Sequence, residues 1–110
     1  MTVFDIKIIE RKWLLLCREK RDDWGGQHIM GWSVAKLLGD KGGVNSVDVL
    51  IHGLNHKDER YRWYSATAIQ KLSKGALNIE DLVVGGNPED TSKAISKTQK
   101  WIAGGRKISK

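Results

Sequence analysis

His52 and His56 are the residues of this chain whose spacing best suits a metal ion. Four positions apart on one helix, their imidazoles would share a face and supply two ligands. A third ligand would have to come from Asp58, Glu59 or a distant residue, and no motif supplies it. Asn55, beside His56, is also typical of a turn, which would separate the two rings. We therefore expect neither a metal site nor a cofactor.

The single cysteine, Cys17, is the one candidate for thiol chemistry. Arg18, Lys20 and Arg21 follow it closely, and nearby cations favour the reactive thiolate. Cys17 also ends the apolar run 14–17, where a cysteine commonly behaves as a small buried hydrophobe. We expect this second role. A lone cysteine excludes an intrachain disulfide framework and is typical of a reducing, cytoplasmic setting.

Gly85 and Gly86 precede Asn87-Pro88, a pair typical of a helix start, and the N-terminus of a helix attracts anions. The stretch lacks the Lys-Ser/Thr pair of a phosphate-binding loop and the third glycine of a dinucleotide fingerprint. A simple turn explains it better. Because no other spacing suits catalysis, the sequence predicts that this protein is not an enzyme.

Tryptophan is abundant, with five in 110 residues. Trp13 and Trp101 fall among apolar residues at helical spacing, so we expect both in the core. Trp63 and Trp32 instead share helical faces with polar and basic residues, which is typical of binding anchors. The alternative is that Trp63 covers a neighbouring hairpin beside an ordinary solvated face. The candidate binding residues on these two faces are Arg60, Trp63, Thr67, Gln70, Lys71, Lys74, His28, Trp32 and Lys36.

The formal net charge of +6 lies entirely in the last twenty residues, because positions 1–90 carry equal numbers of acids and bases. A basic segment of this kind indicates nucleic acid, an anionic membrane surface or an acidic protein as a partner. The alternative is a solubilising chain end. The basic residues of the segment are Lys93, Lys97, Lys100, Arg106, Lys107 and Lys110.

Glycine and asparagine divide the chain into six helical segments. They span about 5–21, 24–38, 46–54, 58–73, 79–84 and 87–103, and each carries apolar residues at helical spacing. The residues expected to cap helices at their starts are Asp22 or Asp23, Ser46, Asp58, Asn78 and Asn87, and Gly39 and Gly104 are expected to end them. Positions 4–8 also alternate as a strand would, but the length of the first segment favours a helix. The prediction is an all-α protein, and no apolar run is long enough to span a membrane.

An offset of 35 residues aligns the second hairpin with the first. It places Asp23 on Asp58, Lys36 on Lys71 and Leu37 on Leu72. The segment 49–72 resembles a HEAT-like repeat, in which an Asp-containing turn precedes a helix that carries an Arg near its start and small residues before a Leu. The matching residues here are Asp58, Arg62, Ala66, Ala68 and Leu72. The segment 23–40 matches less well, and 78–103 only as a pattern.

This resemblance implies a short stack of about three antiparallel helical hairpins, with a non-repeat helical bundle as the alternative. It implies a binding function without chemistry. We expect a single domain over 1–103, followed by a basic tail at 104–110. Some HEAT-like proteins are DNA glycosylases, but this chain lacks their Trp-plus-Asp pocket. The leading hypothesis is a protein partner. Nucleic-acid binding, through the basic segment and the Trp/Arg/Lys face, is the alternative, and homo-oligomerisation through open stack ends is a third.

Overall fold

The computed structural model describes residues 5–18, 27–56, 58–82 and 87–107, with the side chains of residues 27–30 excepted. These ranges contain six α-helices and no strand, which confirms the all-α prediction. The helices are α1 (Ile6–Arg18), α2 (Gln27–Lys41), α3 (Val47–Leu50), α4 (Glu59–Leu72), α5 (Ile79–Leu82) and α6 (Pro88–Ala103). Two short 3-10 turns, η1 (Val44–Ser46) and η2 (Ile51–Gly53), flank α3.

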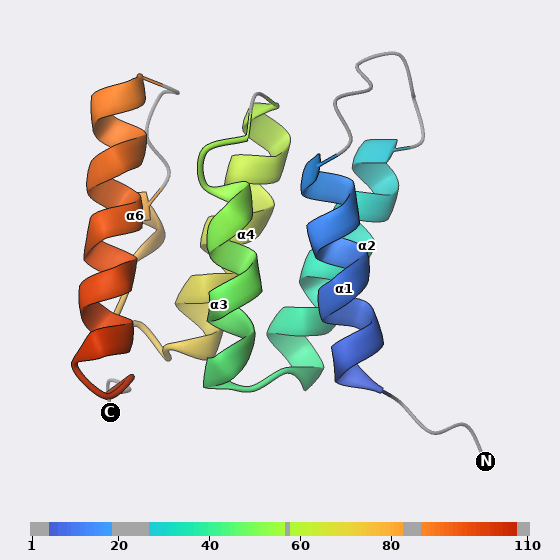
Figure 1. Cartoon of the computed structure of the whole chain (residues 1–110), viewed down its shortest axis with the longest axis horizontal. Helices are drawn as coiled ribbons and strands as arrows, with labels where there is room; N and C mark the ends of the chain where they lie inside the picture. The colour runs from blue at the N-terminus through green and yellow to red at the C-terminus, as the bar shows by residue number, and fades with distance from the viewer. Residues whose placement is uncertain (1–4, 19–26, 57, 83–86, 108–110) are drawn as a thin grey trace.

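The helices lie in three pairs, side by side along the longest axis of the molecule (Figure 1). The pairs are α1/α2, α3/α4 and α5/α6, and α2 packs on α4 while α1 packs on α3. Gly31 lies against Tyr61, and further along Asp40 lies against Lys71, so α2 and α4 run in the same direction. The molecule measures 41 × 35 × 18 Å, and its shortest dimension accommodates two layers of helices. No helix in the described ranges is long and apolar enough to cross a bilayer.

The predicted apolar faces form one core. Trp13 is fully buried, as expected, and its ring stacks on that of Tyr61 with centroids 5.5 Å apart. Trp101 is only half-buried, and its indole Nε1 donates a hydrogen bond to the carbonyl of Lys107. Other fully buried core residues are Leu38, Val47, Leu50, Leu54, Ala66 and Ile69.

Two of the predicted caps are confirmed. The carboxylate of Asp58 accepts the backbone N–H of Arg60 at 2.9 Å, and the amide oxygen of Asn87 accepts that of Glu89 at 2.8 Å. Pro88 occupies the first turn of α6. A backbone N–H at this position has no partner within the helix, so the missing N–H of proline costs no hydrogen bond. The expected cap at Asp22 or Asp23 lies outside the described residues.

The prediction that Gly39 ends the second helix is wrong. α2 continues to Lys41, and Gly39 is buried against α4, where an added Cβ would lie 3.5 Å from the Cβ of Ala68. Residue 39 therefore lies in the contact between two helices instead of ending one of them. Residues 40 and 41, beyond the predicted end of the segment 24–38, belong to the last turn of α2.

Ser46 does not cap the third helix. Its hydroxyl donates instead to the Glu10 carboxylate at 2.6 Å, which ties α3 to α1. The segment 46–54, expected as one helix, is a single α-helical turn between two 3-10 turns. Its predicted apolar face is kept, because Val47, Leu50 and Leu54 are all buried.

Candidate binding groove

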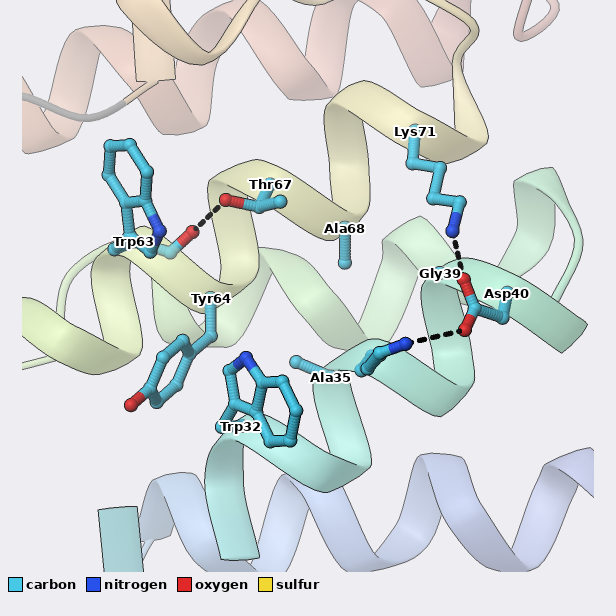
Figure 2. A pocket seen from close by; sticks show the side chains of 10 residues that line it. Trp32, Ala35, Gly39, Asp40, Trp63, Tyr64, Thr67, Ala68 and Lys71 are labelled. Atoms are coloured by element: carbon cyan, nitrogen blue, oxygen red, sulfur yellow. Dashed lines mark hydrogen bonds and ion pairs between the residues drawn. The ribbon is translucent and has the colours of Figure 1, made fainter. Parts of the chain in front are cut away.

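The two candidate faces predicted from the sequence meet in one groove between α2 and α4 (Figure 2). Its cavity has a volume of about 240 Å³. Because α2 and α4 run in the same direction, residues that succeed one another along α2 lie beside residues that succeed one another in the same order along α4. The lining residues are Trp32, Ala35, Lys36, Gly39, Asp40, Trp63, Tyr64, Thr67, Ala68 and Lys71.

The floor of the groove is made of small residues. Ala35 and Ala68 are buried, and Gly39 faces Ala68 at a distance that would place an added Cβ in ordinary van der Waals contact with it. Figure 2 shows the methyl groups of Ala35 and Ala68 directed into the space between the helices. Larger side chains at this crossing would fill the cavity, and it is open because these three are small.

The aromatic end of the groove exposes two large rings. Trp32 is 49% exposed and Trp63 is 52% exposed, while Tyr64 between them is half-buried. In Figure 2, Trp32 and Tyr64 lie beside the groove, and the indole of Trp63 projects away from α2. The hydroxyl of Thr67, another lining residue, donates to the Trp63 carbonyl at 2.8 Å.

The opposite end of the groove is charged. Lys71 donates to the Asp40 carboxylate, and the ammonium of Lys36 lies 3.5 Å from the other Asp40 oxygen. The hydrogen bond from Lys71, together with the charges of both lysines, holds the pKa of Asp40 below its usual value. Asp40 is therefore ionised at neutral pH, and the three side chains carry a net charge of +1. The Lys36 ammonium also lies 6.0 Å from the centroid of the Trp32 ring, within cation–π range.

Other candidates on the same helical faces lie outside the groove. The Arg60 guanidinium is exposed but holds the Asp58 carboxylate through both nitrogens that face it. The side-chain oxygen of Gln70 accepts the backbone N–H of Ile79, so Gln70 fixes the start of α5. Lys74 is exposed beyond the end of α4, in the left-handed region at φ 52°. The side chain of His28 lies outside the described part of the structure.

Helix α6, which carries three of the basic C-terminal residues, lies at the far end of the molecule from α1 and α2 (Figure 1). Lys93, Lys97 and Lys100 are exposed on α6, and Lys97 pairs with Asp81 at 2.9 Å. Arg106 folds back onto α3, where it donates to both Asp48 carboxylate oxygens and to the Val44 carbonyl. Lys107 is exposed, and Lys110 lies outside the described residues.

The two histidines have separate environments. His52 is exposed, whereas the ring of His56 stacks on Tyr61 with centroids 4.3 Å apart. The Nδ1 atom of His56 accepts the backbone N–H of Asp58 at 3.0 Å, so this nitrogen helps to form the turn before α4. Within the described ranges, no three His, Cys, Asp or Glu side chains cluster as metal ligands would.

Cys17 is half-buried, at the edge of the core and not fully inside it. This burial raises the pKa of its thiol to about 12, which opposes thiolate chemistry at neutral pH and supports an unreactive role. The folded thiol keeps its proton over a pH range in which the unfolded thiol loses it. The free energy of unfolding therefore keeps its full value below pH 9 and falls as the pH rises towards 12. The fall is up to about 1.4 kcal/mol per pH unit in this range.

Cys17→Ala should remove this part of the pH dependence. Urea denaturation of the parent and the variant from pH 8 to 11 measures it. Burial also raises the pKa of Tyr61 to about 12, so Tyr61 contributes above pH 10 in both proteins, and the variant loses only the smaller part of that rise that comes from the Cys17 charge. Parallel curves for the two proteins would mean that the thiol ionises normally and is not buried.

Sequence reasoning found Trp32, Lys36, Trp63, Thr67 and Lys71 as binding candidates, but it did not join the two faces or include Asp40. The 35-residue offset that aligns Lys36 with Lys71 was a usable signal, since equivalent positions of successive stacked hairpins lie side by side. Among proteins of known family, function or structure, no family model, curated protein or solved structure matches this chain.

Proposed function

We propose that this protein is a non-enzymatic binding module, a short HEAT-like stack of helical hairpins that holds a protein partner in the α2/α4 groove. The observation that supports this proposal most strongly is a cavity whose floor is made of small residues and which lies beside two half-exposed tryptophans. Exposed indoles contribute little to folding, whereas tryptophan is the side chain most enriched among residues that dominate binding energy.

The HEAT-like assignment is supported by the arrangement of the first two hairpins. α1 neighbours α3 in one layer, and α2 neighbours α4 in parallel, as consecutive stacked repeats require. The third pair fits less well, because α5 is a single turn of four residues against the sixteen of α6.

A protein partner suits the groove better than nucleic acid. Polynucleotide binding depends on several cations that each neutralise a phosphate. Here Asp40 already occupies the space between Lys36 and Lys71, and Arg60 is held by Asp58. Lys93, Lys97 and Lys100 form an exposed row on α6, in which, among the described residues, Lys97 alone is paired, with Asp81. This row favours nucleic-acid binding as a second function, at a surface separate from the groove.

Capture from the native cell extract tests the proposal, with the parent compared with Trp32→Ala and Trp63→Ala. Each variant should bind the partner about thirtyfold more weakly than the parent does, as expected for the loss of a binding anchor. Each should therefore no longer capture it from the extract. The melting temperature of each variant should hardly change, because both rings are half-exposed. Leu15→Ala is the matched control, since Leu15 is also 49% exposed but lies on α1.

Nuclease treatment and salt separate the two functions. A protein held in the groove is retained after nuclease and changes little between low and moderate salt. Loss of all captured material on nuclease treatment, or capture that survives both tryptophan substitutions, would refute a protein-binding groove. Loss of the captured material in the double variant Lys93→Gln/Lys97→Gln would then identify α6 as the binding surface.

A further inference from the structure

The walls of the groove determine how a partner can be recognised. Both walls are regular α-helices, whose backbone N–H and C=O groups are paired within each helix. A partner strand therefore finds no free backbone edge here, and recognition depends on side chains. A cavity of about 240 Å³ has room for one large apolar side chain.

The charged end of the groove adds a second requirement. Lys36 and Lys71 share one carboxylate, so their two positive charges are only half neutralised by Asp40. Lys36 follows Trp32 by one helical turn, about 6 Å along the axis. A carboxylate on a bound peptide would thus meet an ammonium group about one turn from the residue that fills the cavity.

Building on the proposed function, we propose that the α2/α4 groove binds a short acidic peptide segment of the partner protein. One large apolar side chain of this segment lies over Ala35 and Ala68 beside Trp32. An Asp or Glu about one turn away pairs with Lys36 and Lys71. Asp40 occupies the place of this carboxylate in the free protein and competes with it. A single peptide carboxylate suits a net charge of +1, whereas a run of phosphates would be repelled by Asp40.

The probe is a display library of randomised twelve-residue peptides, selected on the whole protein and counter-selected on Trp32→Ala. The expected consensus pairs a large apolar residue with Asp or Glu three or four positions away in a helical peptide, or two positions away in an extended one, because both spacings span about 6 Å. The double variant Lys36→Gln/Lys71→Gln should bind the selected peptide about fivefold more weakly, as expected for exposed ion pairs. Lys93→Gln on α6 is the matched control and should bind it as the parent does.

Asp40→Asn provides the sharper test, because it removes the competitor and leaves both lysines. Affinity for the selected peptide should rise about threefold, within the range expected for exposed charges. A peptide in which the acid is replaced by Gln or Asn should show no gain. Circular dichroism checks that each variant remains helical.

The outcomes separate this inference from the proposed function. Apolar consensus peptides without an acid, or equal binding of the acid and amide peptides, would overturn the acidic preference and leave the groove as a protein-binding site. Selected peptides that bind Trp32→Ala as tightly as the parent, or no enrichment of any peptide, would overturn both the acidic preference and the proposed function. Binding of a dT12 oligonucleotide that competes with the selected peptide would place nucleic acid in the groove instead.

Discussion

Replacement of Gly53 by alanine should lower the free energy of unfolding by about 3 kcal/mol, as expected when a closed core is overpacked. Gly53 is buried where η2 meets α1 and α4. An added Cβ would overlap the Ser65 hydroxyl and lie 2.6 Å from a ring carbon of Trp13. Ser65 and Trp13 are both fully buried, so neither side chain can move into solvent. Urea denaturation at neutral pH measures the effect.

Gly43→Ala is the matched control. An added Cβ at Gly43 has no neighbour within 4 Å, and the φ of −120° is one that alanine adopts readily. This variant should stay within about 0.5 kcal/mol of the parent. Gly53→Ala with an unchanged urea midpoint would mean that Trp13 and Ser65 do not close around residue 53.

Substitution of Ala68 by leucine should destabilise the protein by about 1–3 kcal/mol, the usual cost of extra methylene groups in a closed helix contact. Ala68 is 4% exposed, and its Cβ faces Gly39 across the α2/α4 crossing. A leucine at this position must push the helices apart or enter the groove. Thermal denaturation and urea midpoints both report the loss.

The complementary substitution, Gly39→Ala, should instead raise the free energy of unfolding. Its Cβ would lie 3.5 Å from Ala68, an ordinary contact, and alanine replaces a glycine inside a helix. The expected gain is up to about 1 kcal/mol. If Ala68→Leu has the same melting temperature as the parent, Ala68 faces solvent and does not form the floor of the groove.

Local patterns predicted most of the helices and two of their starts. Asp58 and Asn87 cap helices because a short polar side chain before an apolar-periodic run satisfies free N–H groups whatever packs above it. The buried faces of α1 and α4 likewise follow from helical spacing alone.

Distant contacts decided what the sequence could not predict. Gly39 has the character of a helix stop, yet Ala68, 29 positions later, turns it into a contact point. Ser46 suits a cap, but the Glu10 carboxylate takes its hydroxyl. Gln70 was predicted to bind a partner, but its side-chain oxygen accepts the backbone N–H of Ile79.

The candidate site follows the same division. Helical periodicity placed Trp32 and Trp63 on exposed faces, and both are half-exposed. It could not place Asp40 beside Lys71, because that ion pair depends on the direction and offset of two helices. The groove is a tertiary feature built from locally predictable faces.

The central claim, that the partner lies in the α2/α4 groove, is tested most directly by the indole N–H resonances in two-dimensional NMR. The protein, labelled with ¹⁵N, is titrated with the partner it captures, and the resonances are assigned with Trp→Phe variants. The account predicts large shifts for Trp32 and Trp63 and little change for Trp13, which is fully buried. Shifts at Trp101 on α6, with Trp32 and Trp63 unmoved, would contradict it.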